Sequence, residues 1–301
     1  MEYGLVIDGV TKRFGDFTAV DNISLRVPKG SIYGFLGPNG AGKTTTIRMV
    51  MSIFYPDSGS ITVLGNAKAE AVKDRLGYLP EEKGLYKSMR AEEIIAYFGE
   101  LKGLARATAR TRARDLLDRY GLGEHKQKKC LALSKGMGQK VQILATIIHD
   151  PELVILDEPF SGLDPVNVEL VREIILDIKR AGKTVIFSTH GMEMAEKICD
   201  SILLIHRGKK IIDGALSDVK SQGDHGIQID YDGDGAVLRS IAGVSRLNDS
   251  GKHAEIFLDP GVDPQDVLKA LVGRLSIRRF DLREPSLHEV FVRAVGAKTD
   301  E

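Results

Sequence analysis

Gly37-Pro38-Asn39-Gly40-Ala41-Gly42-Lys43-Thr44 is the stretch of sequence that decides the fold. It matches the pattern G-x-x-x-x-G-K-[ST] at every fixed position, between an apolar stretch at residues 31–36 and a breaker-free stretch at residues 45–50. Those flanks predict a strand before the loop and a helix after it, which is the context that a phosphate-binding loop requires. Glycines let backbone N–H groups turn toward phosphate oxygens, and the N-terminal end of the helix favours the same anion. We therefore expect Lys43 to reach the β- and γ-phosphates of a nucleotide and the Thr44 hydroxyl to bind Mg²⁺.

Two carboxylates follow a second apolar stretch, at residues 153–156. Alternation along a strand would point Asp157 and Glu158 in opposite directions, so we expect them to have different tasks. Asp157 is the candidate that binds Mg²⁺ through water, and Glu158 is the candidate that polarises the water attacking the γ-phosphate. An Asp-Glu-Pro triplet alone often only ends a strand, but together with a phosphate loop it favours catalysis.

A third apolar stretch, residues 184–187, runs on to His190. The carboxyl ends of the strands in an open α/β sheet line up along one edge, and ligands bind there. A lone histidine at a strand end is more often a surface residue. Because this strand belongs to the same predicted sheet as the phosphate loop, we expect His190 to hydrogen-bond the γ-phosphate or the attacking water.

Strands and helices alternate over the first 220 residues, which predicts an α/β layer architecture with a mainly parallel sheet. Apolar residues recur at helical spacing over about residues 82–150, so this segment is expected to be a helical insert. A further helix is expected at residues 166–180. Strands are expected at residues 5–7, 17–20, 23–27, 31–36, 153–156, 184–187 and 201–205.

A polar stretch at residues 220–224 is typical of a linker. We place a domain boundary there, between residues 1–220 and residues 221–301. The second part shows the order βαββαβ, which predicts a small ferredoxin-like α+β domain. A final helix is expected to begin at Ser286, where Glu289 three residues later completes a capping box.

The composition excludes several classes of protein. The 301 residues contain 42 Lys and Arg and 42 Asp and Glu, and this formal net charge of zero argues against nucleic acid as a partner. The 2 cysteines cannot form a disulfide framework, which favours a reducing compartment. No apolar run approaches the roughly 18 residues of a membrane span, and the start lacks the basic head of a signal peptide. We expect a soluble, intracellular protein.

Leu133-Ser134-Lys135-Gly136-Met137-Gly138-Gln139-Lys140 precedes the acidic strand and resembles the signature motif of the ABC-type ATPases. A serine and small residues at the start of a helix form a second anion site on the same chain. Alone this would be an ordinary helix start. Its place between the phosphate loop and Asp157 is the place that the motif has in that family.

Other elements of the same family occur in order along the chain. Phe14 matches the aromatic residue that stacks on adenine, and Val20 follows it. Glu81 lies where the family usually has Gln, and Ser161-Gly162-Leu163-Asp164 matches the loop after the catalytic glutamate. The resemblance covers about residues 3–220.

The resemblance implies a P-loop NTPase of the ABC type, with an antiparallel β subdomain, a RecA-like core with a parallel sheet, and a helical insert. It implies a head-to-tail dimer with a second copy or with a homologous ATPase subunit, and ATP and Mg²⁺ as cofactors. The implied catalytic residues are Glu158, His190 and Lys43. The implied metal ligands are Thr44, Asp157 and Glu81. The implied contacts to ATP are Phe14, Val20, Gly37, Pro38, Asn39, Gly40, Ala41, Gly42, Lys43, Thr44, Thr45 and Asp164, with Ser134 and Gly136 of the other subunit.

A finer match, at residues 37–46 and 78–86, is similar to the separate ATPase subunits of bacterial ABC-2-type exporters. It implies a separate transmembrane permease as a partner, which would dock on the insert at residues 81–97. The subunit would then be cytoplasmic and peripheral, held on the inner face of the cell membrane through the permease. Lys135, Met137 and Glu81 depart from the usual residues of the family.

Two other interpretations remain open. A soluble ABC-type ATPase acting on ribosomes or DNA would usually have two cassettes or a long coiled coil, and this chain has one copy of each motif. The C-terminal domain is also compatible with a ligand-sensing role. Five arginines between residues 106 and 119 are expected to form a solvated helix face, or else to contact lipid headgroups or an acidic partner.

Overall fold

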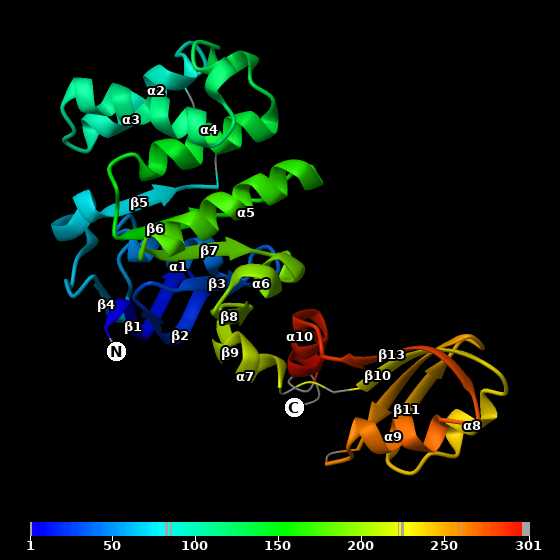
Figure 1. Cartoon of the computed structure of the whole chain (residues 1–301). Coiled ribbons are helices and arrows are strands. Elements are labelled where there is room, and N and C mark those ends of the chain that lie inside the picture. Colours follow the sequence, from blue (N-terminus) through cyan, green and yellow to red (C-terminus); the bar gives the residue numbers. More distant parts are fainter. Residues whose placement is uncertain are drawn as a thin grey trace. The chain divides into compact units, whose positions relative to one another are not determined.

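The computed structural model describes residues 2–81, 84, 86–221, 223, 226–259 and 261–296. The chain divides into two compact units, Met1–Gly214 and Ala215–Glu301 (Figure 1). Residues 82, 83 and 85 at the start of the expected insert lie outside the described part, as do residues 222 and 224 of the expected linker. Among the described residues, no helix is long and apolar enough to span a membrane.

The centre of the first unit is a sheet of 6 strands in the order β5-β6-β7-β3-β8-β9. The pairs β5–β6, β6–β7, β7–β3 and β3–β8 are all parallel, which confirms the expected core. Every residue of β3, β6 and β7 is buried, because a parallel sheet is covered on both faces. The strands are β3 (Ile32–Leu36), β5 (Leu76–Leu79), β6 (Leu153–Asp157), β7 (Thr184–Thr189), β8 (Ser201–His206) and β9 (Lys209–Ala215).

A second sheet of the first unit is antiparallel, with the order β2-β1-β4. Its strands are β1 (Tyr3–Phe14), β2 (Phe17–Pro28) and β4 (Ser58–Val63). The two strands expected at residues 17–20 and 23–27 are in fact one strand. Asn22 has a φ of 49°, and the register of β1 with β2 shifts near it, so a local irregularity interrupts the alternation without ending the pairing.

Several helices pack against the core sheet of the first unit, and those outside the helical insert follow the phosphate loop, β6 and β7. They are α1 (Lys43–Val50), α5 (Pro165–Arg180) and α6 (Met192–Ile198). Ile47, Met49 and Val50 of α1 are buried in one core cluster with residues of both sheets. The phosphate loop is therefore anchored at its end by a helix packed between the two layers.

The helical insert contains α2 (Ala91–Leu101), α3 (Arg106–Arg119) and α4 (Lys135–Ile147), which lie together in Figure 1. Short 3₁₀ turns at Gly123–His125 and Cys130–Ala132 join α3 to α4. The buried positions recur at helical spacing, for example Ile94 and Ile95 on α2 and Ala113 and Leu117 on α3. The apolar pattern thus predicted the helices correctly.

The second unit contains a 4-stranded antiparallel sheet with the order β11-β12-β10-β13. This order is the ferredoxin-like arrangement that the βαββαβ pattern predicted. Ser286 and Glu289 form the expected capping box, since each side chain accepts a hydrogen bond from the other's backbone N–H. The elements are α7 (Leu216–Lys220), β10 (Gly226–Asp232), α8 (Ala236–Arg239), β11 (Val244–Asp249), β12 (His253–Leu258), α9 (Pro264–Leu271), β13 (Ser276–Arg283) and α10 (Leu287–Gly296).

Candidate nucleotide-binding and catalytic site

The phosphate loop joins the end of β3 to the start of α1, and glycines are required at two of its positions. Gly37 has a φ of 152°, and a Cβ there would lie 2.2 Å from the carbonyl oxygen of Ile205. Gly42 has a φ of 107°, and a Cβ there would lie 2.5 Å from the carbonyl oxygen of Ala19. The loop therefore passes close to the backbones of β8 and β2, which fixes its path before any ligand binds.

Lys43 is the first residue of α1 and is only 5% exposed. Its Nζ donates hydrogen bonds to the carbonyl oxygens of Gly37, at 2.7 Å, and of Pro38, at 3.2 Å. The same Nζ lies 3.5 Å from Oε1 of Glu158. The ammonium is thus held inside the curve of the loop, on the side that faces the end of β6.

Asp157 ends β6 and is 1% exposed. Its Oδ1 accepts hydrogen bonds from Oγ1 of Thr44, at 3.3 Å, and from the hydroxyl of Ser188. Its Oδ2 is buried and has no hydrogen-bond partner among the described residues. Leaving a buried carboxylate oxygen unpaired is costly, and a carboxylate beside a hydroxyl is a donor set that suits Mg²⁺. The residues present therefore fit a magnesium ion.

Glu158 follows Asp157 and is the first residue after β6. Its φ is 49°, a left-handed conformation that costs a residue with a side chain about 1–2 kcal/mol. Oε2 lies 3.1 Å from Nδ1 of His190, while Oε1 faces Lys43. Strand alternation therefore does not extend to Glu158. The two carboxylates nevertheless have separate partners. Glu158 after β6 and His190 after β7 are in contact, as expected for strands that end at the same edge of the sheet.

Ser188, which the sequence interpretation passed over, joins these two acidic residues. It lies on β7, is fully buried, and donates its hydroxyl hydrogen to Oδ1 of Asp157. Its Oγ also accepts a hydrogen bond from the backbone N–H of Glu158, at 2.9 Å. The available signal was a serine directly after the apolar residues 185–187 of a buried strand. A buried serine in such a strand needs a partner.

Ser134, Gly136 and Asp164 lie at the adjoining N-terminal ends of α4 and α5. Ser134 caps α4 by accepting a hydrogen bond from the N–H of Met137, at 3.2 Å. Asp164 caps α5 by accepting one from the N–H of Asn167, at 3.0 Å, and hydrogen bonding to Asn167 lowers the pKa of Asp164. A Cβ on Gly136 would lie 2.2 Å from Cγ of Asn167. These contacts join the signature segment to the start of α5.

Phe14 and Val20 are placed differently on the antiparallel sheet. Phe14 is 47% exposed, and its ring packs edge-on against Phe54, with the ring centres 5.6 Å apart. Val20 is buried, next to Ala19, whose carbonyl faces Gly42 of the phosphate loop. Thr45 lies in the first turn of α1, directly after the loop. Val20 and Thr45 thus border the loop, and Phe14 offers an exposed aromatic ring.

Glu81 follows β5 and is exposed. Burial raises the pKa of the Tyr78 phenol, and the carboxylates of Asp157 and Glu81 raise it further. The pKa of Tyr78 therefore depends on both carboxylates. Within the described part of the chain, no hydrogen bond joins Glu81 to Thr44 or Asp157.

The fold and this cluster define a P-loop NTPase, and the comparisons identify the family. The chain matches the family described as "ABC transporter" over residues 20–161 and the family described as "ATP-binding protein DrrA1-3-like, C-terminal domain" over residues 214–295. It is 40% identical over 294 residues to the ABC transporter ATP-binding protein YhaQ of Bacillus subtilis (strain 168), covering 97% of this chain and 99% of that protein. The chain therefore belongs to the ABC transporter ATP-binding proteins, which bind and hydrolyse ATP.

Two further similarities extend this result. The chain is 35% identical over 303 residues to Nod factor export ATP-binding protein I of Sinorhizobium fredii (strain NBRC 101917 / NGR234), covering 98% of this chain and 87% of that protein. A solved structure described as the ATP-binding subunit of an ABC transporter superposes with a TM-score of 0.66 at 30% identity. That match covers 72% of this chain and 92% of the other. It confirms the ABC-type ATPase fold.

Proposed function

We propose that this protein is the ATPase subunit of an exporter, that it dimerises around two ATP molecules, and that it drives a separate permease in the membrane. The observation that supports export is the similarity to the Nod factor export protein, which extends over 98% of this chain and so includes both units. The observation that supports the hydrolytic mechanism is the cluster of buried Lys43, Asp157 and Glu158, with the exposed His190 in contact with Glu158.

ATP would bind first through the phosphate loop. Lys43 would exchange its hydrogen bonds to the carbonyls of Gly37 and Pro38 for the β- and γ-phosphate oxygens, which are anionic and therefore stronger acceptors. The N-terminal end of α1 adds a partial positive charge on the same side. The exposed ring of Phe14 would stack on adenine, with Val20 beside it.

Thr44 and Asp157 would hold Mg²⁺, since a buried oxygen of Asp157 lacks a partner in the described part of the chain and the Thr44 hydroxyl lies next to the other oxygen. The bound ion would supply positive charge that offsets the negative charge developing on the phosphates during transfer of the γ-phosphoryl group to water. Ser188 holds Asp157 in place from the opposite side. Glu81, which is exposed in this structure, would add a further oxygen ligand to this set when ATP and Mg²⁺ are bound.

Glu158 would be the general base for the attacking water. Its Oε2 is in contact with His190, and its Oε1 faces Lys43, so both oxygens of the carboxylate are fixed in direction. His190 keeps the carboxylate oriented and would donate a hydrogen bond to the γ-phosphate. A base held in this way takes the proton from water as the oxygen attacks phosphorus.

A second subunit would complete each site. Ser134 and Gly136 lie at the N-terminal end of α4, where backbone N–H groups favour an anion. In the dimer this end would face the γ-phosphate held by the partner. Asp164, at the start of α5, would contact the partner's phosphate loop. The partner would be a second copy or a homologous ATPase subunit.

The two parts of the chain would have separate roles. Residues 1–220 would form the ATPase domain, with the insert at about residues 82–150 carrying the permease contact near residues 81–97. Residues 221–301 would form an accessory domain. The protein would then lie on the cytoplasmic face of the membrane, held there by its permease.

Co-purification from detergent-solubilised membranes tests this proposal. We expect a tagged chain to bring down a polytopic membrane protein in a fixed ratio. Recovery of ribosomal proteins or DNA, with no membrane protein, would contradict export and support the alternative of a soluble ABC-type ATPase.

A further inference from the structure

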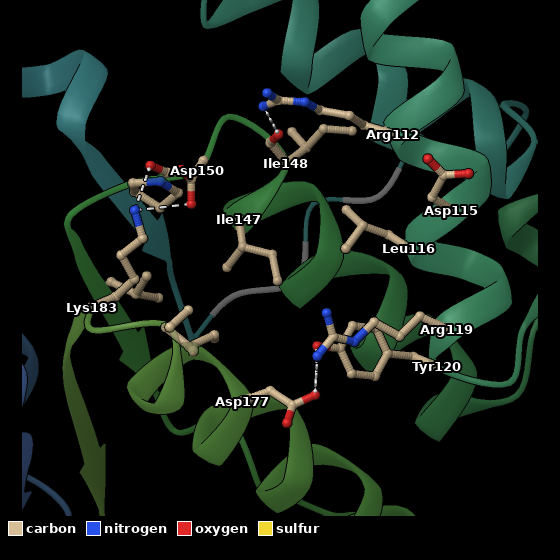
Figure 2. A pocket seen from close by; sticks show the side chains of 14 residues that line it. Arg112, Asp115, Leu116, Arg119, Tyr120, Ile147, Ile148, Asp150, Asp177 and Lys183 are labelled. Carbon is tan, nitrogen blue, oxygen red and sulfur yellow. Dashed lines mark hydrogen bonds and ion pairs between the residues drawn. The ribbon is translucent and has the colours of Figure 1, made fainter.

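A cavity of about 330 Å³ lies between the helical insert and the core of the first unit (Figure 2). Its walls come from α3, from the end of α4, from β6 and from the end of α5. Val154 lines it at the start of β6, whereas Asp157 ends that strand. The cavity is therefore at the opposite end of β6 from the catalytic cluster. Its volume is at the lower end of the range for small-molecule sites, about 300–1,000 Å³.

The middle of this cavity is apolar. Leu116 of α3 and Ile147 of α4 both line it (Figure 2). The apolar lining consists of Leu116, Ile147, Ile148, Pro151, Val154, Ile178 and Ala181. An occupant would bury an apolar group here, and removing that surface from water favours binding.

Most charges at the rim neutralise one another. Arg119 Nη2 lies 2.9 Å from Asp177 Oδ2, and the Tyr120 hydroxyl donates a hydrogen bond to the same oxygen at 3.1 Å. Burial raises the pKa of Tyr120 to about 12, so the phenol keeps its proton. Lys183 Nζ lies 2.9 Å from Asp150 Oδ1 on the other side. Because these groups are already paired with one another, they do not require a counter-charge from a ligand.

Arg112 and Asp115 differ from the other charged residues at the rim. Both lie on α3 and line the cavity, and their spacing of three residues would permit an ion pair. Within the described part of the chain neither of them is ion-paired. Instead, Nη1 of Arg112 reaches the carbonyl oxygen of Ile148, at 3.3 Å (Figure 2). The rim thus presents one cation and one anion of its own, a helical turn apart, above an apolar interior.

We propose that this cavity binds a free α-amino acid with a large apolar side chain. The carboxylate pairs with Arg112, the ammonium pairs with Asp115, and the side chain enters the apolar interior. A zwitterion supplies a counter-charge to both rim residues. A simple anion or a simple cation would leave one rim residue without a counter-charge. The bound amino acid contacts α3 on one side and β6 and α5 on the other, so it ties the insert to the core.

The test is calorimetric titration of the full-length chain with three probes. L-phenylalanine carries both charges, 3-phenylpropionate lacks the ammonium, and 2-phenylethylamine lacks the carboxylate. We expect L-phenylalanine to bind and each of the other two to bind at least about tenfold more weakly, because each loses a charge-assisted hydrogen bond. Absence of binding by L-phenylalanine up to its solubility limit, or equal binding of the three probes, would overturn the proposal.

Variants assign the two charges to their residues. Arg112→Gln should weaken the binding of L-phenylalanine about tenfold and leave the affinity for 2-phenylethylamine unchanged. Asp115→Asn should weaken the binding of L-phenylalanine and leave the affinity for 3-phenylpropionate unchanged. Ala181→Phe should abolish binding of all three by filling the cavity. Arg110→Gln is the matched control, since Arg110 is exposed on the same helix but lines a different hollow. Unchanged L-phenylalanine affinity in both Arg112→Gln and Asp115→Asn would contradict the assignment.

Discussion

Lys43 Nζ lies 3.5 Å from Glu158 Oε1, and both side chains are buried. This pair connects the start of α1 to the residue that follows β6, so the phosphate-binding part of the site touches the hydrolytic part directly. Removing one partner of a buried pair leaves the other charge uncompensated. Substitution of either residue is therefore expected to affect the position of the other, and binding and hydrolysis must be measured separately.

We predict that Lys43→Ala lowers ATP affinity at least about hundredfold, which corresponds to roughly 2.7 kcal/mol. The phosphate loop loses its ammonium, and the carboxylate of Glu158 then repels the phosphates without a neighbouring cation. Titration with a fluorescent ATP analogue measures the affinity. Lys269→Ala, which removes an exposed lysine from the second unit, is the control and should bind normally. Wild-type affinity in Lys43→Ala would show that the loop is wrongly assigned.

Ser188→Ala should lower kcat about tenfold to hundredfold, since Asp157 and Glu158 each lose a hydrogen bond that fixes them. The KM for ATP should change little, because Ser188 touches the two carboxylates and not the phosphate loop. Steady-state ATPase assays separate the two constants, and thermal unfolding reports whether the variant is folded. An unchanged kcat in a folded variant would mean that the positions of both carboxylates are fixed by other contacts.

Glu81→Gln should preserve ATPase activity and lower the Mg²⁺ concentration needed for the half-maximal rate. A carboxylate near the γ-phosphate adds repulsion, about 4 kcal/mol at 4 Å and an effective dielectric of 20, and the metal must offset it. Glu81 is exposed in this structure, so solvent reduces that value until the site closes. The test is to measure the ATPase rate of both proteins as a function of the free Mg²⁺ concentration. Identical curves would place Glu81 in the permease contact instead.

Removal of the second unit should leave an active ATPase, because the cluster around Lys43 lies in the first unit. The position of the cut matters. Helix α7 packs against α10, and its Val219 is buried, so a chain ending at Ser221 exposes Val219 by losing α10. We expect the chain ending at Gly214 to be the more soluble of the two, with ATPase activity within about threefold of the full chain. Gel filtration and ATPase assays of both truncations check this, and an inactive, folded 1–214 chain would contradict it.

The sequence was sufficient for those parts of the site that depend on local pattern. The phosphate loop needed glycines at Gly37 and Gly42, and close approach of other backbones explains both. Buried parallel strands are continuous apolar runs, so β6 and β7 and the polar residues at their ends could be predicted. The order of elements was also enough to predict the antiparallel sheet of the second unit.

Other features depend on contacts between distant segments. The strands β4, β5 and β9 were not predicted, because Ser58–Val63 is half polar, Leu76–Leu79 has only 4 residues, and Lys209–Ala215 is largely exposed or half-buried. The left-handed backbone of Glu158 and the role of Ser188 arise only when β6 and β7 pair. Arg112 and Asp115 likewise line a cavity only because α3 packs beside the end of α4.

The most direct test of the account is the Glu158→Gln variant, in which the base is replaced by an amide of the same shape. ATP affinity should remain within about threefold of wild type, hydrolysis should fall at least about hundredfold, and gel filtration with ATP and Mg²⁺ should show a dimer. Asp249→Asn, in the second unit, is a matched carboxylate-to-amide control and should hydrolyse ATP normally. Hydrolysis by Glu158→Gln at the wild-type rate, or a strict monomer at high concentration with ATP bound, would contradict the central claim that Glu158 activates water in a nucleotide-bridged dimer.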